Sequence, residues 1–160
     1  MVETYWDLGM NDQTCIWFAQ KYKGETRLID YYENSGFGLD HYKDILDSKN
    51  YDYSTHIAPF DIKVRELGNM GKSRLESALE LGIAFEVAPK LSIEDGIEAT
   101  RKALTNCWFD KEKCKLGIEY LKAYQKRWDD KNQCFRNKPL HNFASHCSDA
   151  FRTGVVGEGV

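Results

Sequence analysis

Three stretches near the start of the chain have the apolar pattern of β-strands. Residues 3–9, 13–22 and 26–33 are rich in Thr, Ile, Trp, Phe and Tyr, which favour strands. Short turns at 9–12 and 23–25 separate them, and the Gly, Asn and Asp residues there tolerate a tight backbone. Strands joined by such short turns pair side by side in opposite directions, so we predict an antiparallel meander.

The rest of the chain alternates helical and strand patterns. Ser73 with Glu76, and Ser92 with Asp95, are N-cap pairs that open helices, and Pro59 ends a strand because proline cannot continue a ladder. In chain order we predict helix 39–48, strand 51–58, helix 73–81, strand 83–87, helix 92–104, helix 111–126, a hairpin over 128–136 and helix 146–155.

This order predicts a mixed α/β fold. Strands that follow helices pair parallel to the first strand, which places the first strand in the centre of the sheet. Asp61 then lies at the carboxyl end of its parallel neighbour, the edge where ligands collect in open α/β sheets. No boundary signal divides the chain, so we expect one domain over residues 1–156 and a flexible tail over 157–160.

Composition restricts the function classes only modestly. The chain has 160 residues, with 22 basic and 25 acidic side chains and a formal net charge of -3. This balance does not indicate the basic surface common in nucleic-acid-binding domains, although local clusters matter more than the sum. Five cysteines without a CxxC pair predict reduced thiols rather than a zinc site. No apolar run approaches a membrane span.

Three aspartates are the candidate chemistry. Asp7 lies inside an apolar run two residues before Gly9, and a buried charge there needs a cation or a donor. Asp61 emerges from a strand, and Asp149 shares a helical face with His146 three residues earlier. Each residue alone also has a structural explanation. Asp7 could be a strand-end aspartate bonded to its turn, Asp61 an ordinary loop residue, and His146 with Asp149 a solvated helix face.

Taken together, the motifs resemble the nuclease domain of the large terminase subunit of tailed bacteriophages. The resemblance spans nearly the whole chain. It rests on Tyr5-Trp6-Asp7-Leu8-Gly9 with Asp12 and Thr14, Ile29 to Gly36, Asp61-Ile62, Arg65 to Gly68, Trp108-Phe109-Asp110, and Pro139-Leu140-His141 through Ser145-His146 to Asp149-Ala150-Phe151-Arg152.

The resemblance implies a ribonuclease-H-like fold and a metal-dependent DNA endonuclease that cuts concatemeric phage DNA during genome packaging. Asp7, Asp61 and Asp149 match the acidic triad that would bind two Mg²⁺ or Mn²⁺ ions, and His146 matches an additional ligand. Oxygen ligands suit those ions. The implied partners are double-stranded DNA, the terminase ATPase domain, the small terminase subunit and the portal, in the cytoplasm of the bacterial host.

Some residues depart from that pattern. Phe60 stands where a histidine is expected before the second aspartate, and Asn142-Phe143 replaces an Asp-Trp pair. Residues 68–73 end in Gly-Lys-Ser, but only two residues separate their glycines, so they are no Walker A loop. We therefore expect no ATPase motor in this chain.

A basic cluster follows the second aspartate and predicts weak, salt-sensitive phosphate contacts. A solvated approach to a helix is an equally good reading of the same residues. The cluster consists of Lys63, Arg65, Lys72 and Arg74.

Two other functions stay open. A branched-DNA resolvase or an RNA–DNA hybrid nuclease would keep the fold and the metals and change the substrate. A non-catalytic packaging module would keep only the scaffold, although a binding surface gains nothing from three converging acids.

Overall fold

The computed structural model describes residues 1–9, 13–64, 70–124, 126–129, 134–139 and 143–158. Its elements, in chain order, are β1 (Val2–Asp7), β2 (Gln13–Tyr22), β3 (Glu25–Ser35), α1 (Leu39–Lys49), β4 (Tyr53–Ala58), the 3₁₀ helix η1 (Phe60–Lys63), α2 (Arg74–Glu80), β5 (Phe85–Val87), α3 (Ile93–Leu104), β6 (Cys107–Phe109), α4 (Lys115–Ala123), β7 (Lys126–Asp129), β8 (Cys134–Pro139) and α5 (Phe143–Gly157).

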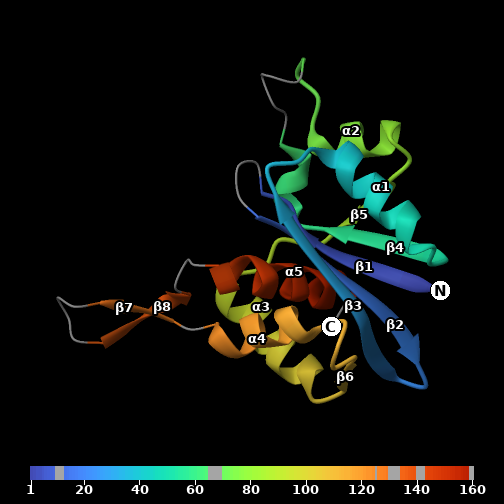
Figure 1. The fold of residues 1–160 in the computed structure, drawn as a ribbon. Helices are drawn as coiled ribbons and strands as arrows, with labels where there is room; N and C mark the ends of the chain where they lie inside the picture. Colours follow the sequence, from blue (N-terminus) through green and yellow to red (C-terminus); the bar gives the residue numbers. More distant parts are fainter. Residues whose placement is uncertain (10–12, 65–69, 125, 130–133, 140–142, 159–160) are drawn as a thin grey trace.

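Six strands form one mixed sheet in the order β5-β4-β1-β2-β3-β6 (Figure 1). β1 and β2, and β2 and β3, are antiparallel, whereas β4 runs parallel to β1 and β5 parallel to β4. The predicted meander and the central first strand are therefore confirmed. Together with the flanking helices, this order has the mixed α/β form of a ribonuclease-H-like fold.

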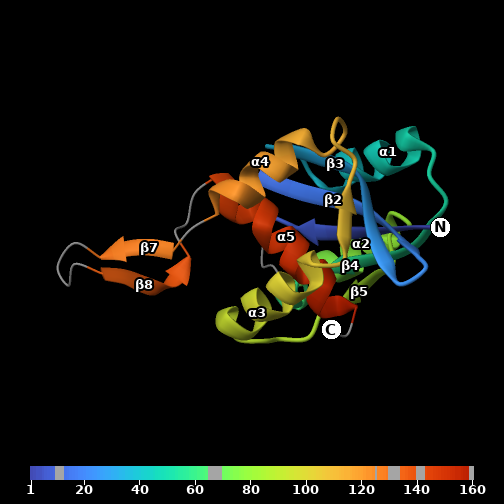
Figure 2. The ribbon, with the colours of Figure 1, turned by 90° about the horizontal axis from the view of Figure 1, so that it is seen from below.

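Two helical layers enclose the sheet (Figures 1 and 2). α1 and α2 cover one face, where Trp6 is buried against Tyr42 and Phe85. α3, α4 and α5 cover the other face, where Trp17 packs against Tyr31 and Phe151. The strand pair β7–β8 stands away from this body in both views.

The predicted helix starts at Ser73 and Ser92 are present. The Ser73 hydroxyl accepts the Glu76 N–H at 3.2 Å, and the Ser92 hydroxyl accepts the Asp95 N–H at 3.1 Å. Each bond satisfies an N–H that the first helical turn leaves unpaired.

The structure also differs from the predicted elements. The edge strand β6, parallel to β3, was not predicted, and it lies in the connection expected between two helices. The helix expected from residue 111 begins at Lys115, since the Asp110 carboxylate accepts the N–H groups of Glu112 and Lys113 and forms a turn. α5 begins three residues earlier than expected and includes Gly157.

The single-domain assignment stays a prediction. None of the helices in the described part of the chain is long and apolar enough to cross a membrane.

Candidate active site

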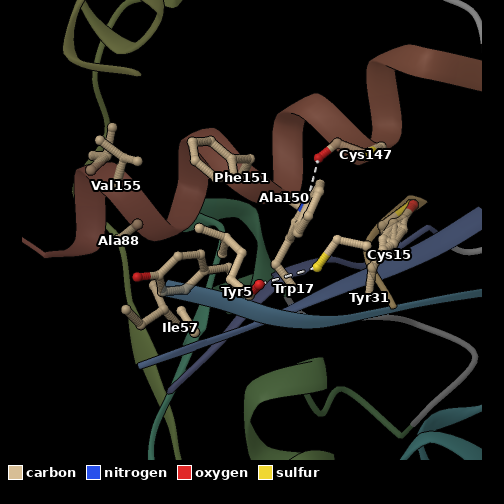
Figure 3. Close-up of a cluster of buried hydrophobic side chains, with 14 residues drawn as sticks. Tyr5, Cys15, Trp17, Tyr31, Ile57, Ala88, Cys147, Ala150, Phe151 and Val155 are labelled. Atoms are coloured by element: carbon tan, nitrogen blue, oxygen red, sulfur yellow. Dashed lines mark hydrogen bonds between the residues drawn. The ribbon is translucent and has the colours of Figure 1, made fainter. Parts of the chain in front are cut away.

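Helix α5 carries two of the four predicted site residues and is fixed firmly to the sheet. The Trp17 indole N–H donates to the Cys147 carbonyl at 3.1 Å (Figure 3). Further along, Gly154 lies so close to the Tyr5 ring that an added Cβ would meet ring atoms at 2.0 Å. Since Cys147 and Ala150 face the buried cluster in Figure 3, the neighbouring positions 146 and 149 lie towards the margin of the helix, where the side chains are partly exposed.

Asp7 is the last residue of β1 and faces the α5 side of the sheet. It pairs across the ladder with Cys15, whose side chain belongs to the cluster under α5. Because β1 is central and runs parallel to β4, Asp7 lies at the carboxyl edge predicted for a ligand site.

His146 contacts Asp7 directly. Its Nδ1 lies 3.1 Å from Oδ2 of Asp7, with side-chain exposures of 15% for the histidine and 20% for the aspartate. A carboxylate accepts hydrogen bonds, so Nδ1 is the donor in this contact; a neutral ring with this tautomer has its lone pair on Nε2, the form in which imidazole binds metals. A carboxylate on the other ring nitrogen orients many metal-binding histidines in this way.

Asp61 lies in η1, immediately after β4, and is exposed. β4 is the parallel neighbour of β1, so Asp61 follows the strand end next to that of Asp7, as the sequence predicted. Two i→i+3 hydrogen bonds form this 3₁₀ turn: the Ile62 N–H donates to the Pro59 carbonyl at 3.1 Å, and the Val64 N–H donates to the Asp61 carbonyl at 3.0 Å.

Asp149 is held by a cation of its own helix. Arg152 donates from Nη2 to Oδ1 of Asp149 at 2.9 Å. The Arg152 stem lies against Gly96 of α3, where an added Cβ would meet its Cδ at 2.7 Å. Burial and the negative charge of Asp149 raise the pKa of Tyr124 to about 12, which places that ring beside the pair.

The four predicted residues are therefore brought together unequally. Asp7 and His146 touch, whereas Asp61 and Asp149 occupy neighbouring elements. In the described residues, no three His, Cys, Asp or Glu side chains lie close enough together to hold one metal ion. The donor set, three carboxylates and one imidazole, has the chemistry that Mg²⁺ and Mn²⁺ accept, but only the Asp7–His146 pair is assembled.

Glu33, which the sequence analysis did not name as a site residue, lies on the same face of the sheet as Asp7. Across the ladder, Asp7 pairs with Cys15 and Cys15 pairs with Glu33, so the two acids lie two strands apart on one face. Burial raises the pKa of Glu33, while an interaction with Tyr120 opposes the rise. The turn between β2 and β3 would place Glu33 on the opposite face of the sheet. If the pairing of Tyr22 with Glu25 continued without a shift, Tyr32 rather than Glu33 would lie opposite Cys15. A register shift beside Ala19 moves the pairing by one residue.

The basic residues predicted to contact DNA differ in their surroundings. Lys63 ends η1 and lies over the exposed ring of Phe60, with 5.4 Å from Nζ to the ring centroid. Lys72 pairs with Glu80 at 2.6 Å, and Arg74 donates to the Leu8 carbonyl at 2.8 Å. Arg65 lies outside the described residues. Lys63 is the closest of the described three to Asp61 in sequence, and DNA contact by this cluster stays a prediction.

Known proteins share this fold without close sequence similarity. No model of a protein family matches the chain, and no curated protein has significant sequence similarity to it. Solved structures are similar in fold. The large terminase of a thermophilic bacteriophage has a TM-score of 0.73 at 19% identity, over 96% of this chain and 38% of that one.

Two isolated nuclease domains match along most of their length. The P22 large terminase nuclease domain has a TM-score of 0.72 at 18% identity, over 98% of this chain and 80% of that one. The nuclease domain of the SPP1 large terminase, solved with bound Mn, has a TM-score of 0.66 at 16% identity, over 98% and 85%. At these identities the likeness shows the fold. The resemblance to large terminase nuclease domains is thus confirmed at the level of structure, and this chain spans about 38% of the thermophilic phage protein.

Proposed function

We propose that this chain is a metal-dependent DNA endonuclease, the nuclease part of a large terminase that cuts concatemeric phage DNA during packaging. The observation that carries the proposal is the contact between Asp7 and His146, 3.1 Å apart, at the carboxyl edge of a sheet with the terminase nuclease fold. The ATPase domain, the small subunit and the portal are proposed partners, and the host cytoplasm is the proposed compartment.

Asp7, Asp61, Asp149 and His146 are the proposed ligands of Mg²⁺ or Mn²⁺. When bound, two such ions would supply an activated water and stabilise the leaving oxygen. Mn bound to the SPP1 domain supports a divalent ion here. The proposal requires Asp61 and Asp149 to move towards Asp7, and Arg152 to release the Asp149 carboxylate.

The residues around the pair have defined tasks in this proposal. His146 fixes the orientation of the Asp7 carboxylate through its Nδ1–H. The Cys147 carbonyl and Gly154 hold α5 against the sheet, so that His146 stays in contact with Asp7. Precise placement of this kind contributes strongly to catalysis, because small displacements of reacting groups cost large factors in rate.

The test is cleavage of supercoiled plasmid and of linear duplex DNA in Mn²⁺. We expect the wild-type chain to cleave, and Asp7→Asn to lose at least about 100-fold in rate while keeping its unfolding midpoint. Unchanged cleavage by Asp7→Asn would falsify the assignment. A preference for four-way junctions or RNA–DNA hybrids over linear duplex would redirect the proposal to those substrates.

A further inference from the structure

A groove lies beside the candidate site, on the α5 side of the sheet. It has a volume of about 150 Å³ and is bordered by the start of η1, the connection between β5 and α3, the start of α3 and the C-terminal half of α5. Helices α3 and α5 lie side by side in Figure 2. The groove adjoins both outlying acids, because Phe60 precedes Asp61 and Arg152 is paired with Asp149.

The floor and rim of the groove combine apolar surface with positive charge. Phe60 is 46% exposed and Leu91 is 46% exposed, although both are large apolar residues. Lys90 lines the groove, and Lys63 lies next to it through a contact with Phe60; their Nζ atoms are 5.8 and 5.4 Å from the Phe60 ring centroid. None of the described residues that line the groove is acidic.

This composition matches a sugar–phosphate chain. Lysines contact phosphates without regard to base identity, and an aromatic ring offers an apolar surface to a sugar or base between them. A purely apolar partner would leave both ammonium groups to be desolvated without compensation. An acidic peptide would satisfy the lysines, but it has no reason to lie next to the candidate metal ligands.

We propose that this groove binds the backbone of the DNA strand next to the cleavage point, with Lys63 and Lys90 on phosphates and Phe60 against a deoxyribose. The inference rests on the proposed function and specifies where the substrate lies. Lys72 and Arg74, which the sequence predicted to contact DNA, would then lie away from the main DNA contact, because the groove opens beside α3 and α5.

The experiment measures binding of a fluorescent random-sequence duplex by anisotropy in EDTA, over a series of salt concentrations. Lys90→Ala should weaken binding about 3–10-fold and reduce the slope of log K against log salt by about 0.9, the value for one lost phosphate contact. Phe60→Ala should weaken binding several-fold with an unchanged slope, and Phe60→Tyr should restore it. Lys102, an exposed lysine at the far end of α3, is the matched control, and Lys102→Ala should bind as the wild type does.

Cleavage in Mn²⁺, measured on the same proteins, separates the two proposals. If the wild type cleaves DNA while Lys90→Ala and Phe60→Ala bind with unchanged affinity and slope, the groove assignment is wrong and the nuclease stands. If the wild type neither binds nor cleaves duplex DNA, the proposed function fails and the groove assignment fails with it. Because Lys90 and Phe60 are exposed, unchanged unfolding midpoints of the variants will exclude misfolding as the cause of a loss.

Discussion

An aspartate on one face of the sheet differs from an aspartate on the other in its burial and in its hydrogen-bond partners. On the α1 side, Asp30 is 7% exposed and is satisfied by Lys49 at 2.7 Å, Tyr51 at 3.1 Å and the Tyr31 N–H at 2.8 Å. On the α5 side, Asp7 has His146, which is itself a candidate ligand.

The same residue type is thus buried and fully bonded on one face, and partly exposed beside a histidine on the other. A fully bonded, buried aspartate such as Asp30 contributes to stability and has little capacity left for a ligand. Asp7 lies at a strand end where water and ions can reach it. Burial and the number of partners, rather than residue type, distinguish the two.

The docking of α5 is the feature on which the α5 face depends most. Gly154→Ala would place a methyl group within the Tyr5 ring, so we expect a loss of about 3 kcal/mol or more in the free energy of unfolding. Replacing a helical glycine by alanine usually increases the free energy of unfolding by about 1 kcal/mol. At Gly154 the contact with the Tyr5 ring turns this expected gain in stability into a loss.

Chemical denaturation measures this effect. Ser148→Ala is the matched control in the same helix, because the buried Ser148 hydroxyl has no hydrogen-bond partner in the described part of the chain and its removal should cost almost nothing. Equal stability of both variants would show that α5 is not held as described.

Two Asp→Asn substitutions compare the faces directly. Asp30→Asn should destabilise the fold by about 2–3 kcal/mol, because Lys49 is left without its charged partner. Asp7→Asn should cost less than about 1 kcal/mol, because the amide oxygen still accepts from His146. Metal affinity, measured by calorimetry with Mn²⁺, should change in the reverse order. An Asp7→Asn protein that unfolds as easily as Asp30→Asn would contradict the distinction between the faces.

The α1 face also predicts a loss of stability in acid. Burial lowers the pKa of His56 to about 4. The Thr4 hydroxyl, which accepts the Trp6 indole N–H, lies 2.6 Å from Nδ1 of His56. The unfolded ring has a pKa near 6.5, so the stabilising contribution is complete above that pH and is lost as the pH falls towards 4.

We expect a loss of about 2 kcal/mol from this residue, less than the full shift would give because the ring is partly solvated. Urea unfolding from pH 7 to pH 4 measures it, and His56→Gln should flatten the curve in that range. A wild-type curve that the substitution leaves unchanged would show that His56 titrates normally.

On the α5 face we expect a smaller change in stability, with the opposite dependence on pH. Burial and the neighbouring Glu158 carboxylate raise the pKa of Glu3 to about 7, so folding favours its protonated form. The stability from this pair is complete below about pH 4.5 and is lost as the pH rises through 7. Glu3→Gln should raise the unfolding midpoint at pH 8 by about 2–4 °C, corresponding to about 1 kcal/mol, and leave it unchanged at pH 4.5. Lys21→Gln, which removes the cation near Glu158, should lower the midpoint at pH 8.

Local signals were enough to predict much of this architecture. The turns predicted the meander, Ser73 and Ser92 predicted two helix starts, and the first strand was placed correctly in the centre of the sheet, although it ends at Asp7 rather than at the predicted residue 9. These features depend on neighbours in sequence, so the residue pattern contains them.

Features that depend on distant contacts could not be predicted from the sequence pattern. The register shift that places Glu33 on the face of Asp7 reflects packing across the sheet. The contact of the Arg152 stem with Gly96 requires the approach of α3 to α5. The incomplete gathering of Asp61 and Asp149 around Asp7 is likewise a property of tertiary placement rather than of motif order.

A crystal structure of the protein with Mn²⁺, located by its anomalous scattering, tests the central claim most directly. The account predicts manganese bound by Asp7, with Asp61 and Asp149 drawn into the same coordination sphere and the bond between Asp149 and Arg152 broken. Manganese bound elsewhere, or an Asp7 that binds none at millimolar concentration, would contradict it.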